Sequence, residues 1–291
     1  MKDTLALSHS WPLPLRRLVL EGFSAIRSGN EDLAQARFEQ ALAIEPNLPE
    51  AHLGLALTLR PGPAYQDWLA RLHEILAPAL YMEIGIEKGL SLRLARAPTK
   101  AIGIDPHPQV GGVDWVTETR IHAVTSALFF ASPDRTVDIS APVELAFIDG
   151  DHRFEAVLHD LAELEPFMAP DGVIAIHDTW PLDELTSGRV HATGFYSGDG
   201  WKIVPCLKAV RPDLRIMTIP AAPTGLTLIT GFSPKSSLLR ERFSALVEAF
   251  VPLPYAVYAA APAKVLNLGS NGEDALDQVL RWRASAKAKS S

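Results

Sequence analysis

The sequence has one cysteine, Cys206, among 291 residues, so no internal disulfide bond can form. A cysteine-rich structural zinc site is excluded for the same reason. No apolar run reaches the roughly 18 residues that span a bilayer. The N-terminus also lacks the basic start and apolar stretch of a secretory signal. These absences predict a cytoplasmic protein, in a reducing compartment, with no membrane partner.

The chain also lacks an excess of basic residues. Its 27 lysines and arginines are outnumbered by 34 acidic residues, which gives a net charge of −7. Nucleic acid is therefore excluded as the main partner, because neutralising phosphates requires a basic surface. Hydrophobic residues make up 47% of the chain, enough to bury a sizeable core. The length allows one large domain with an appendage.

Residues 15–60 repeat apolar and small residues at three- and four-residue spacing, which predicts helices. The segment resembles a tetratricopeptide repeat (TPR), which places small residues where two helices cross and a proline after the second helix. The matching positions are Gly22, Gly29, Ala34, Phe38, Ala41 and Pro46. Leu18 and Glu21 depart from the signature, which has tryptophan and leucine there. These helices are either a cap on the main domain or a surface for a protein partner or for self-association.

Residues 61–63, Pro-Gly-Pro, mark the predicted boundary of the helical region. We therefore divide the chain into a helical TPR-like region at 1–62, an α/β domain at 63–235, and a helical C-terminal extension with a tail at 236–291. In the middle region strands alternate with helices, which predicts a parallel sheet covered on both faces. Only five residues join the last two predicted strands, too few for a parallel crossover, so these strands should be antiparallel.

Residues 79–95 predict a strand, a glycine turn and a helix. Gly85 and Gly89 allow a tight turn and a close approach of the backbone to a ligand. Glu83 precedes the turn and could accept a hydrogen bond from an ammonium group. This spacing, E-x-G-x-x-x-G, suits an amino-acid head group better than a pyrophosphate. Asp105 ends the next predicted strand, where an acid can bind the two hydroxyls of a ribose.

The segments MEIGIEKGLS and AIGID resemble the first two motifs of class I S-adenosylmethionine-dependent methyltransferases, and the resemblance covers residues 79–231. It implies a Rossmann-like seven-stranded sheet, mostly parallel with one antiparallel strand. It also implies S-adenosyl-L-methionine (SAM) as the cofactor. The residues implied to bind it are Gly85 and Gly89 at the methionine part, Ser91 at its carboxylate, Asp105 at the ribose, and Thr125 and Ser126 at the adenine.

Two further predicted strands end in ionisable side chains. Asp149 ends one, in FIDGDH, and His177 and Asp178 end the other, in GVIAIHD. If these strands are neighbours, their ends lie about 5 Å apart. Two carboxylates and an imidazole could then share a divalent ion. Oxygen ligands favour Mg²⁺, whereas the imidazole also allows Mn²⁺, Fe²⁺ or Zn²⁺.

The run IDGDHRFEAVLHDL followed by GVIAIHD resembles a subgroup of small-molecule O-methyltransferases. The subgroup includes macrocin-type sugar O-methyltransferases and is related in layout to catechol O-methyltransferases. The resemblance implies that Asp149, His177 and Asp178 hold the metal and that His152 is the catalytic base. Histidine titrates near neutral pH, so His152 could take a hydroxyl proton. The chain departs from the pattern at His177, where an acid is usual.

Other polar and aromatic residues near these two motifs are assigned structural roles or a place in a pocket. Asp151 is predicted to cap the helix that follows it, and Asp160 and Glu163 to lie on a solvated face of that helix. Residues 179–200 form a long, aromatic, glycine-containing segment, which predicts part of an acceptor pocket or a lid.

The sequence thus predicts a SAM-dependent methyltransferase that methylates a hydroxyl of a small molecule or glycan with the help of a divalent metal. The alternative is a TPR-containing adaptor or scaffold whose methyltransferase-like domain is not catalytic. A scaffold would not need ionisable residues at the strand ends, and this favours the enzyme.

Overall fold

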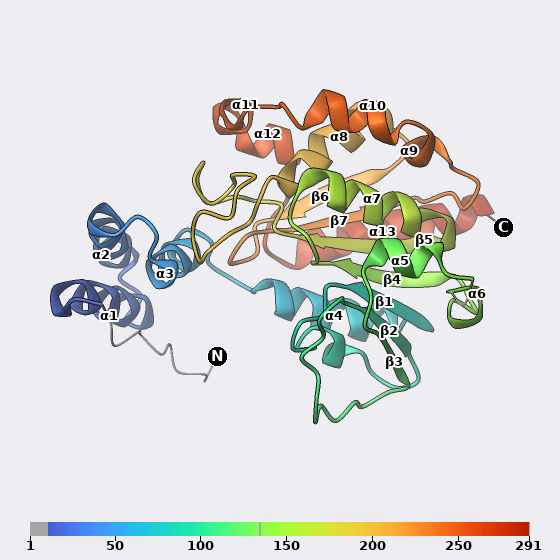
Figure 1. Ribbon diagram of the computed structural model, residues 1–291, viewed down its shortest axis with the longest axis horizontal. Helices are drawn as coiled ribbons and strands as arrows, with labels where there is room; N and C mark the ends of the chain where they lie inside the picture. The colour runs from blue at the N-terminus through green and yellow to red at the C-terminus, as the bar shows by residue number, and fades with distance from the viewer. Residues whose placement is uncertain (1–10, 134, 291) are drawn as a thin grey trace.

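Three helices, α1 (Leu13–Arg27), α2 (Glu31–Ile44) and α3 (Pro49–Leu59), open the computed structural model, which describes residues 11–133 and 135–290. They form an arm beside the main body of the molecule (Figure 1). The side chain of Asn30 caps α2 by accepting from Leu33 N. Pro49 begins α3, a position where its missing N–H is harmless. The predicted helices are confirmed, while the resemblance to a tetratricopeptide repeat stays a prediction.

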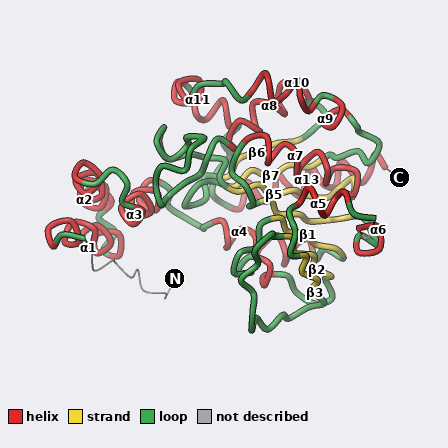
Figure 2. Tube along the Cα trace, viewed as in Figure 1, coloured by secondary structure: helices red, strands yellow, loops and turns green. Residues whose placement is uncertain are grey.

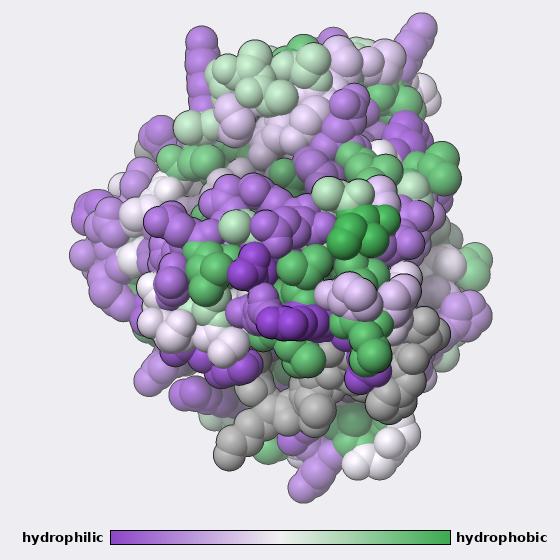
Figure 3. All heavy atoms as spheres, turned by 90° about the vertical axis from the view of Figure 1, so that its left-hand side faces the viewer, coloured by the Kyte–Doolittle hydropathy of each residue, from purple (hydrophilic) through white to green (hydrophobic). Residues whose placement is uncertain are grey.

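The three helices pack around the ring of Phe38, which is fully buried. Gly22 and Gly54 face this ring, and a methyl group on either would overlap it. Small residues therefore allow the helices to approach each other. The end of the molecule formed by these helices mixes hydrophilic and hydrophobic side chains on its surface (Figure 3).

Seven strands form a single sheet in the order β3-β2-β1-β4-β5-β7-β6. All neighbouring pairs are parallel except those of β7, which runs antiparallel to both β5 and β6. The predicted mostly parallel sheet with one antiparallel strand is confirmed. The strands are β1 (Leu80–Ile84), β2 (Lys100–Ile104), β3 (Thr119–His122), β4 (Val143–Ile148), β5 (Met168–His177), β6 (Arg215–Ile219) and β7 (Leu226–Thr230).

Helices cover both faces of this sheet, as Figure 2 shows. They are α4 (Tyr65–Leu76), α5 (Ser126–Ala131), α6 (Arg135–Asp138), α7 (Phe154–Leu164), α8 (Ile203–Val210), α9 (Leu238–Glu241), α10 (Phe243–Phe250), α11 (Tyr255–Ala260), α12 (Pro262–Leu266) and α13 (Glu273–Ser290). Successive strand residues point to opposite faces. In β1, Met82 accordingly belongs to the core layer that includes residues of α7 and α8, whereas Tyr81 belongs to the layer that includes residues of α4 and α13. Among the described helices we find none with the length and apolar character of a membrane span.

The predicted helix at residues 89–97 is wrong. The chain instead makes a single 3₁₀ turn, η1 (Leu92–Leu94). Gly89 has a φ of +70°, which lies outside the helical region. Pro98 restricts Ala97 to extended conformations, so the segment is bounded at both ends. Further 3₁₀ turns, η2 (Glu165–Phe167) and η3 (Gly200–Lys202), border α7 and α8.

Candidate functional site

The strand order reverses between β1 and β4, and a cavity of about 930 Å³ opens at the carboxyl ends of these strands. Ligands of open α/β sheets bind at such a reversal, because the loops of the two neighbouring strands diverge there. The lining comes from the loops after β1, β2, β4 and β5, from the starts of α4 and α5, from one side of α7, and from residues 194–196 and 223–224. The volume lies within the range typical of small-molecule sites.

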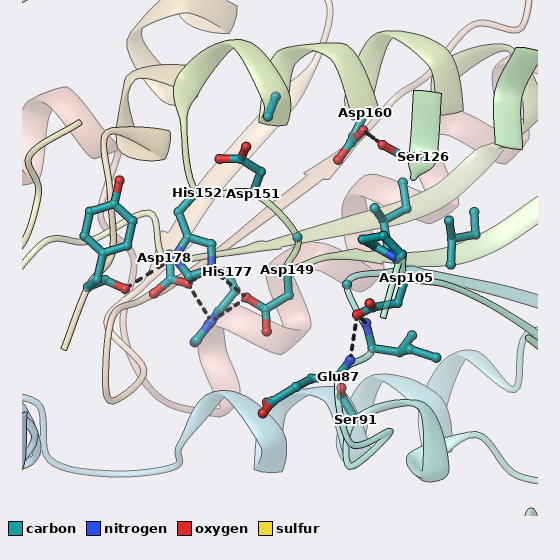
Figure 4. Close-up of a pocket in the computed structure, with 18 of the residues that line it drawn as sticks. Glu87, Ser91, Asp105, Ser126, Asp149, Asp151, His152, Asp160, His177 and Asp178 are labelled. Carbon is teal, nitrogen blue, oxygen red and sulfur yellow. Dashed lines mark hydrogen bonds and ion pairs between the residues drawn. The ribbon is translucent and has the colours of Figure 1, made fainter. Parts of the chain in front are cut away.

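At the β1–β2 side of the cavity, Asp105 is fixed by backbone hydrogen bonds (Figure 4). Its Oδ2 accepts from Ile86 N at 3.0 Å and Glu87 N at 2.9 Å, and its Oδ1 accepts from His107 N at 2.7 Å. Gly85 precedes this loop with a φ of +87°, and a Cβ there would overlap the carbonyl of Asp149. The turn after β1 therefore requires glycine, and it leaves the Asp105 carboxylate at the cavity wall.

Glu83 lies beneath the cavity and is fully buried, outside the lining. Its carboxylate accepts from the hydroxyls of Tyr81 and Ser91, each at 2.5 Å. Burial raises the pKa of Glu83 to about 8, although the two hydrogen bonds oppose the shift. Ser91 does line the cavity, so Glu83 acts on the cavity surface through Ser91. A contact between Glu83 and an ammonium group stays a prediction.

Gly89 is also outside the lining, because the ring of Trp115 covers it. A Cβ at this position would lie 2.7 Å from Trp115 Cη2. The structure thus supports a packing role for Gly89, while its predicted contact with a cofactor stays a prediction.

Ser126 lines the opposite wall and donates to Asp160 Oδ1 at 2.5 Å. The prediction that Asp160 lies on a solvated helix face is wrong, since Asp160 is only 4% exposed. The sequence carried a signal for this: Asp160 follows Val157 by three residues and precedes Leu164 by four, which places it on the apolar face of α7. A hydrogen bond from His159 to Asp160 raises the pKa of that histidine.

The four ionisable residues predicted at the ends of β4 and β5 do meet. Figure 4 shows Asp149, His152, His177 and Asp178 pointing toward one another. His177 Nδ1 lies 3.0 Å from Asp149 Oδ1 and 3.3 Å from Asp178 Oδ2. His152 Nε2 lies 3.2 Å from Asp178 Oδ2 and 4.0 Å from Asp149 Oδ1. Asp178 has a φ of +56°, a conformation that non-glycine residues adopt mainly where the surroundings enforce it.

The charges in this cluster depend on one another. Burial alone would lower the pKa of His177, but the carboxylates of Asp178 and Asp149 outweigh it and raise that pKa to about 10. Burial would likewise raise the pKa of Asp178, yet His152 and His177 hold it well below its ordinary value. His177 is therefore a cation that bridges the two carboxylates at neutral pH.

Three of these residues form a potential metal-binding group by the positions of their ligand atoms, while the predicted set of Asp149, His177 and Asp178 stays a prediction. Ligand atoms of Asp149, His152 and Asp178 all lie within 4.8 Å of one another. His152 Nδ1 lies 3.3 Å from the carbonyl of Tyr196, so this nitrogen must donate. Its Nε2 then faces the two carboxylates. In this arrangement His152 completes the set, and His177 contacts both acids through its Nδ1.

Residues 82–179 match the family model of a methyltransferase domain. The match begins within β1 and ends one residue after Asp178, so it contains both ends of the cavity described above. No curated protein matches the chain.

Several solved structures are similar to this chain. TomG, an O-methyltransferase of Streptomyces achromogenes involved in tomaymycin synthesis and solved with SAM, is 15% identical, with a TM-score of 0.44 over 58% of this chain and 80% of that one. An O-methyltransferase from Bacillus cereus, solved with S-adenosylhomocysteine (SAH), is 13% identical, with a TM-score of 0.41 over 66% of this chain and 96% of that one. A methyltransferase from Geobacter sulfurreducens is 14% identical, with a TM-score of 0.41 over 68% and 88% of the two chains.

The segment after β5, residues 179–200, supplies an aromatic wall of the cavity. Phe195 and Tyr196 line the cavity, and Tyr196 stacks on His152 with ring centroids 5.7 Å apart. Trp201, just beyond this segment, is buried against Tyr258 and lies outside the lining. This part of the predicted acceptor pocket therefore rests on residues 195–196.

Asp151 does not cap α7 in the way predicted. It accepts from Arg153 N at 3.0 Å and pairs with the Arg153 guanidinium. The first helical residue, Phe154, instead donates its N–H to Asp199 at 2.8 Å. Asp199 is distant in sequence, so local helix-capping rules could not have identified it.

Sequence reasoning also missed two residues at the cluster. Tyr65, at the start of α4, lies against His177 with ring centroids 4.0 Å apart. The hydroxyl of Thr224 lies 3.3 Å from His177 Nε2. Both line the cavity from outside the segment that matches the family model. Neither belongs to a motif, so nothing in the sequence signals them.

Proposed function

We propose that the protein transfers a methyl group from SAM to a hydroxyl of a small molecule or glycan. The observation that carries the proposal is that Asp105 and the cluster of Asp149, His152 and Asp178 line one continuous cavity. Methyl transfer from a sulfonium is a direct displacement, so the two reactants must be held in line. A cavity with a nucleoside-binding acid at one end and proton-accepting groups at the other suits this reaction.

The lining of the cavity fits this cofactor. Asp105 presents a carboxylate fixed by three backbone N–H groups, which can accept from ribose hydroxyls. Among the charged residues of the lining, acidic side chains outnumber the lysine, Lys88, and this charge favours a ligand with a positive centre. When bound, SAM supplies a methyl group on a good neutral leaving group.

The cluster also fits a divalent ion, with Asp149, His152 and Asp178 as its ligands. His177 hydrogen-bonds to both carboxylates, and the Tyr196 carbonyl fixes the tautomer of His152. Partners of this kind orient the ligands of protein metal sites. When bound, the ion would supply positive charge that lowers the pKa of a hydroxyl.

His152 has a second role that excludes the first. With its Nε2 free, the ring can take the hydroxyl proton, and Asp178 at 3.2 Å stabilises the resulting cation. One nitrogen cannot hold an ion and a proton together. The two roles therefore predict different responses to removal of metal.

Calorimetric titration with SAH tests the cofactor. We expect saturable binding, and its absence at millimolar ligand would refute the proposal. Incubation with SAM and a panel of phenols, sugars and alcohols, followed by mass spectrometry, then tests transfer to oxygen. Products methylated only at nitrogen or sulfur would contradict O-methylation.

Titration with Mn²⁺ and treatment with EDTA decide the role of His152. If His152 is a ligand, His152→Ala abolishes Mn²⁺ binding, whereas His177→Ala weakens it by about 10–100-fold. If His152 is the base, Mn²⁺ binding or its absence is unaffected by His152→Ala, which lowers the rate while affinity for SAH stays intact; turnover then survives EDTA only where no metal takes part.

A further inference from the structure

Helix α3 of the N-terminal arm lies against the segment that forms the aromatic wall (Figure 1). Gly194 packs on the ring of Pro49, and a Cβ at Gly194 would overlap that ring. The next residue, Phe195, stacks on His52 at 5.8 Å with only 10° between the ring planes. Gly194 and Phe195 both line the cavity. The residues that contact α3 on one side therefore face the cavity on the other, where a ligand would bind.

His52 is held in place from its own helix and faces the loop. It is 1% exposed, and its Nδ1 donates to the carbonyl of Leu48 at 3.1 Å. Its Nε2 lies 3.8 Å from Asp183 Oδ2, while the other oxygen of Asp183 accepts from Thr186 N at 2.8 Å. The ring thus contacts the segment at both Asp183 and Phe195.

Arg60, at the end of α3, ties two cavity segments together. Its guanidinium donates to the carbonyls of Trp180 at 3.1 Å, Pro181 at 3.0 Å and Pro223. It also lies over the ring of Trp180, 4.4 Å from the centroid. Arg60 is only 4% exposed, and burying a charge is costly unless such partners satisfy it. The neighbour of Pro223, Thr224, contacts His177 of the acidic cluster.

From these contacts we infer that the N-terminal helices form part of the acceptor site, because they hold one of its walls in position. Pro49, His52 and Arg60 are positioning residues that hold the acceptor wall at residues 180–199 and 223–224. This inference rests on the proposed function, because it assumes that the cofactor binds at the β1–β2 end of the cavity and that the acceptor binds beside this wall. The helices then influence the affinity for the acceptor and its selectivity, whereas the affinity for the cofactor does not depend on them.

Hydrogen–deuterium exchange of the full chain, measured both without ligand and with SAH, tests the contact with Pro49. In Gly194→Ala the added methyl must push the wall away from the helix, so peptides from residues 181–199 should exchange about 10-fold faster. Gly188→Ala is the matched control, because a Cβ there meets no atom closer than 3.5 Å. Peptides from residues 79–105 should match the wild type in both variants. Equal exchange of residues 181–199 in the two variants would overturn the inference.

A second pair of variants, His52→Ala and His52→Phe, tests the same inference if Gly194→Ala folds poorly. His52→Ala removes the ring that stacks on Phe195 and should raise exchange of the same peptides about 10-fold. His52→Phe restores a ring and should return exchange close to the wild-type rate. A merely global loss of stability would raise exchange everywhere, including residues 79–105. That outcome, or a failure of phenylalanine to rescue, counts against a positioning role.

Kinetics separate this inference from the proposed function. With an acceptor found in the methyl-transfer screen, Gly194→Ala should raise the KM for the acceptor about 10-fold, with kcat and the KM for SAM nearly unchanged. If SAH never binds, the proposed function fails, while the exchange pattern still decides whether the helices hold the wall.

Discussion

Two buried histidines show how the surroundings of a single ring decide its charge. His177 faces two carboxylates, which raise its pKa to about 10. His73 is 3% exposed, and neither of its ring nitrogens has a hydrogen-bond partner in the described chain. Burial therefore lowers the pKa of His73 to about 4, from an ordinary value of 6.5. The same side chain is thus a cation at the ligand cavity and a neutral packing group under the sheet.

His73 gives the protein a specific sensitivity to acid. Below pH 6.5 the unfolded chain takes up a proton that the folded ring refuses, so stability is lost as the pH falls from 6.5 toward 4. The loss should be roughly 2 kcal/mol at pH 5. His73→Phe keeps the edge contact with Tyr81 and removes this dependence. Urea unfolding at pH 7.5 and pH 5 measures it, and an equal pH effect in both proteins would contradict the assignment.

Asp105 allows a sharp test of the predicted cofactor end. Three backbone N–H groups point at its two oxygens, so the amide nitrogen of Asp105→Asn would face at least one donor. We expect a loss of about 1–3 kcal/mol in stability and a corresponding loss of affinity for SAH. Asp114→Asn is the control, since it makes the same chemical change outside the cavity lining. Calorimetry should find normal binding only in the control.

At the scale of helices and strands, prediction succeeded where a local pattern decides the structure. Alternating strands and helices predicted the sheet, and a five-residue link predicted the antiparallel pair of β6 and β7. Prediction failed after β1 because the helical pattern of residues 89–97 was read without the limits set by Gly89 and Pro98. Where backbone restriction and side-chain pattern disagree, the backbone restriction prevails.

The helical arm depends on the space left by its glycines. Gly54→Ala should favour α3 by local propensity, yet its methyl would overlap the buried ring of Phe38. Overpacking of this kind costs about 1–3 kcal/mol. Urea unfolding followed by circular dichroism should therefore show a less stable protein. Gly111→Ala, with no atom within 4 Å of the added Cβ, should behave as wild type. Unchanged stability of Gly54→Ala would mean that the helices separate at little cost.

At the scale of the whole molecule, the candidate site combines short motifs with distant segments. The motifs placed Asp105, Asp149 and Asp178 correctly at one cavity, because the carboxyl ends of neighbouring parallel strands must meet. Tyr65 and Thr224 reach the same cavity from segments that have no motif. Asp199 and Arg60 act through contacts that exist only after folding. The strand-end acids and the segment 179–200 could therefore be identified from sequence, whereas the contacts that hold that segment in place could not.

The C-terminal helix α13 packs against the sheet of the central region. Although α13 lies in the predicted C-terminal extension, its residues Ala275, Leu276 and Val279 are buried in the core layer that includes β5 and β7. Leu276→Ala should then cost about 2–5 kcal/mol, as for other core leucines. Calorimetry should find a fall in Tm of about 5 °C or more, since 1 kcal/mol corresponds to about 2–4 °C at this size. Asp277→Ala, on the exposed side of the same helix, should stay within about 0.5 kcal/mol of wild type. Equal melting of the two variants would show that the sheet is stable without this helix.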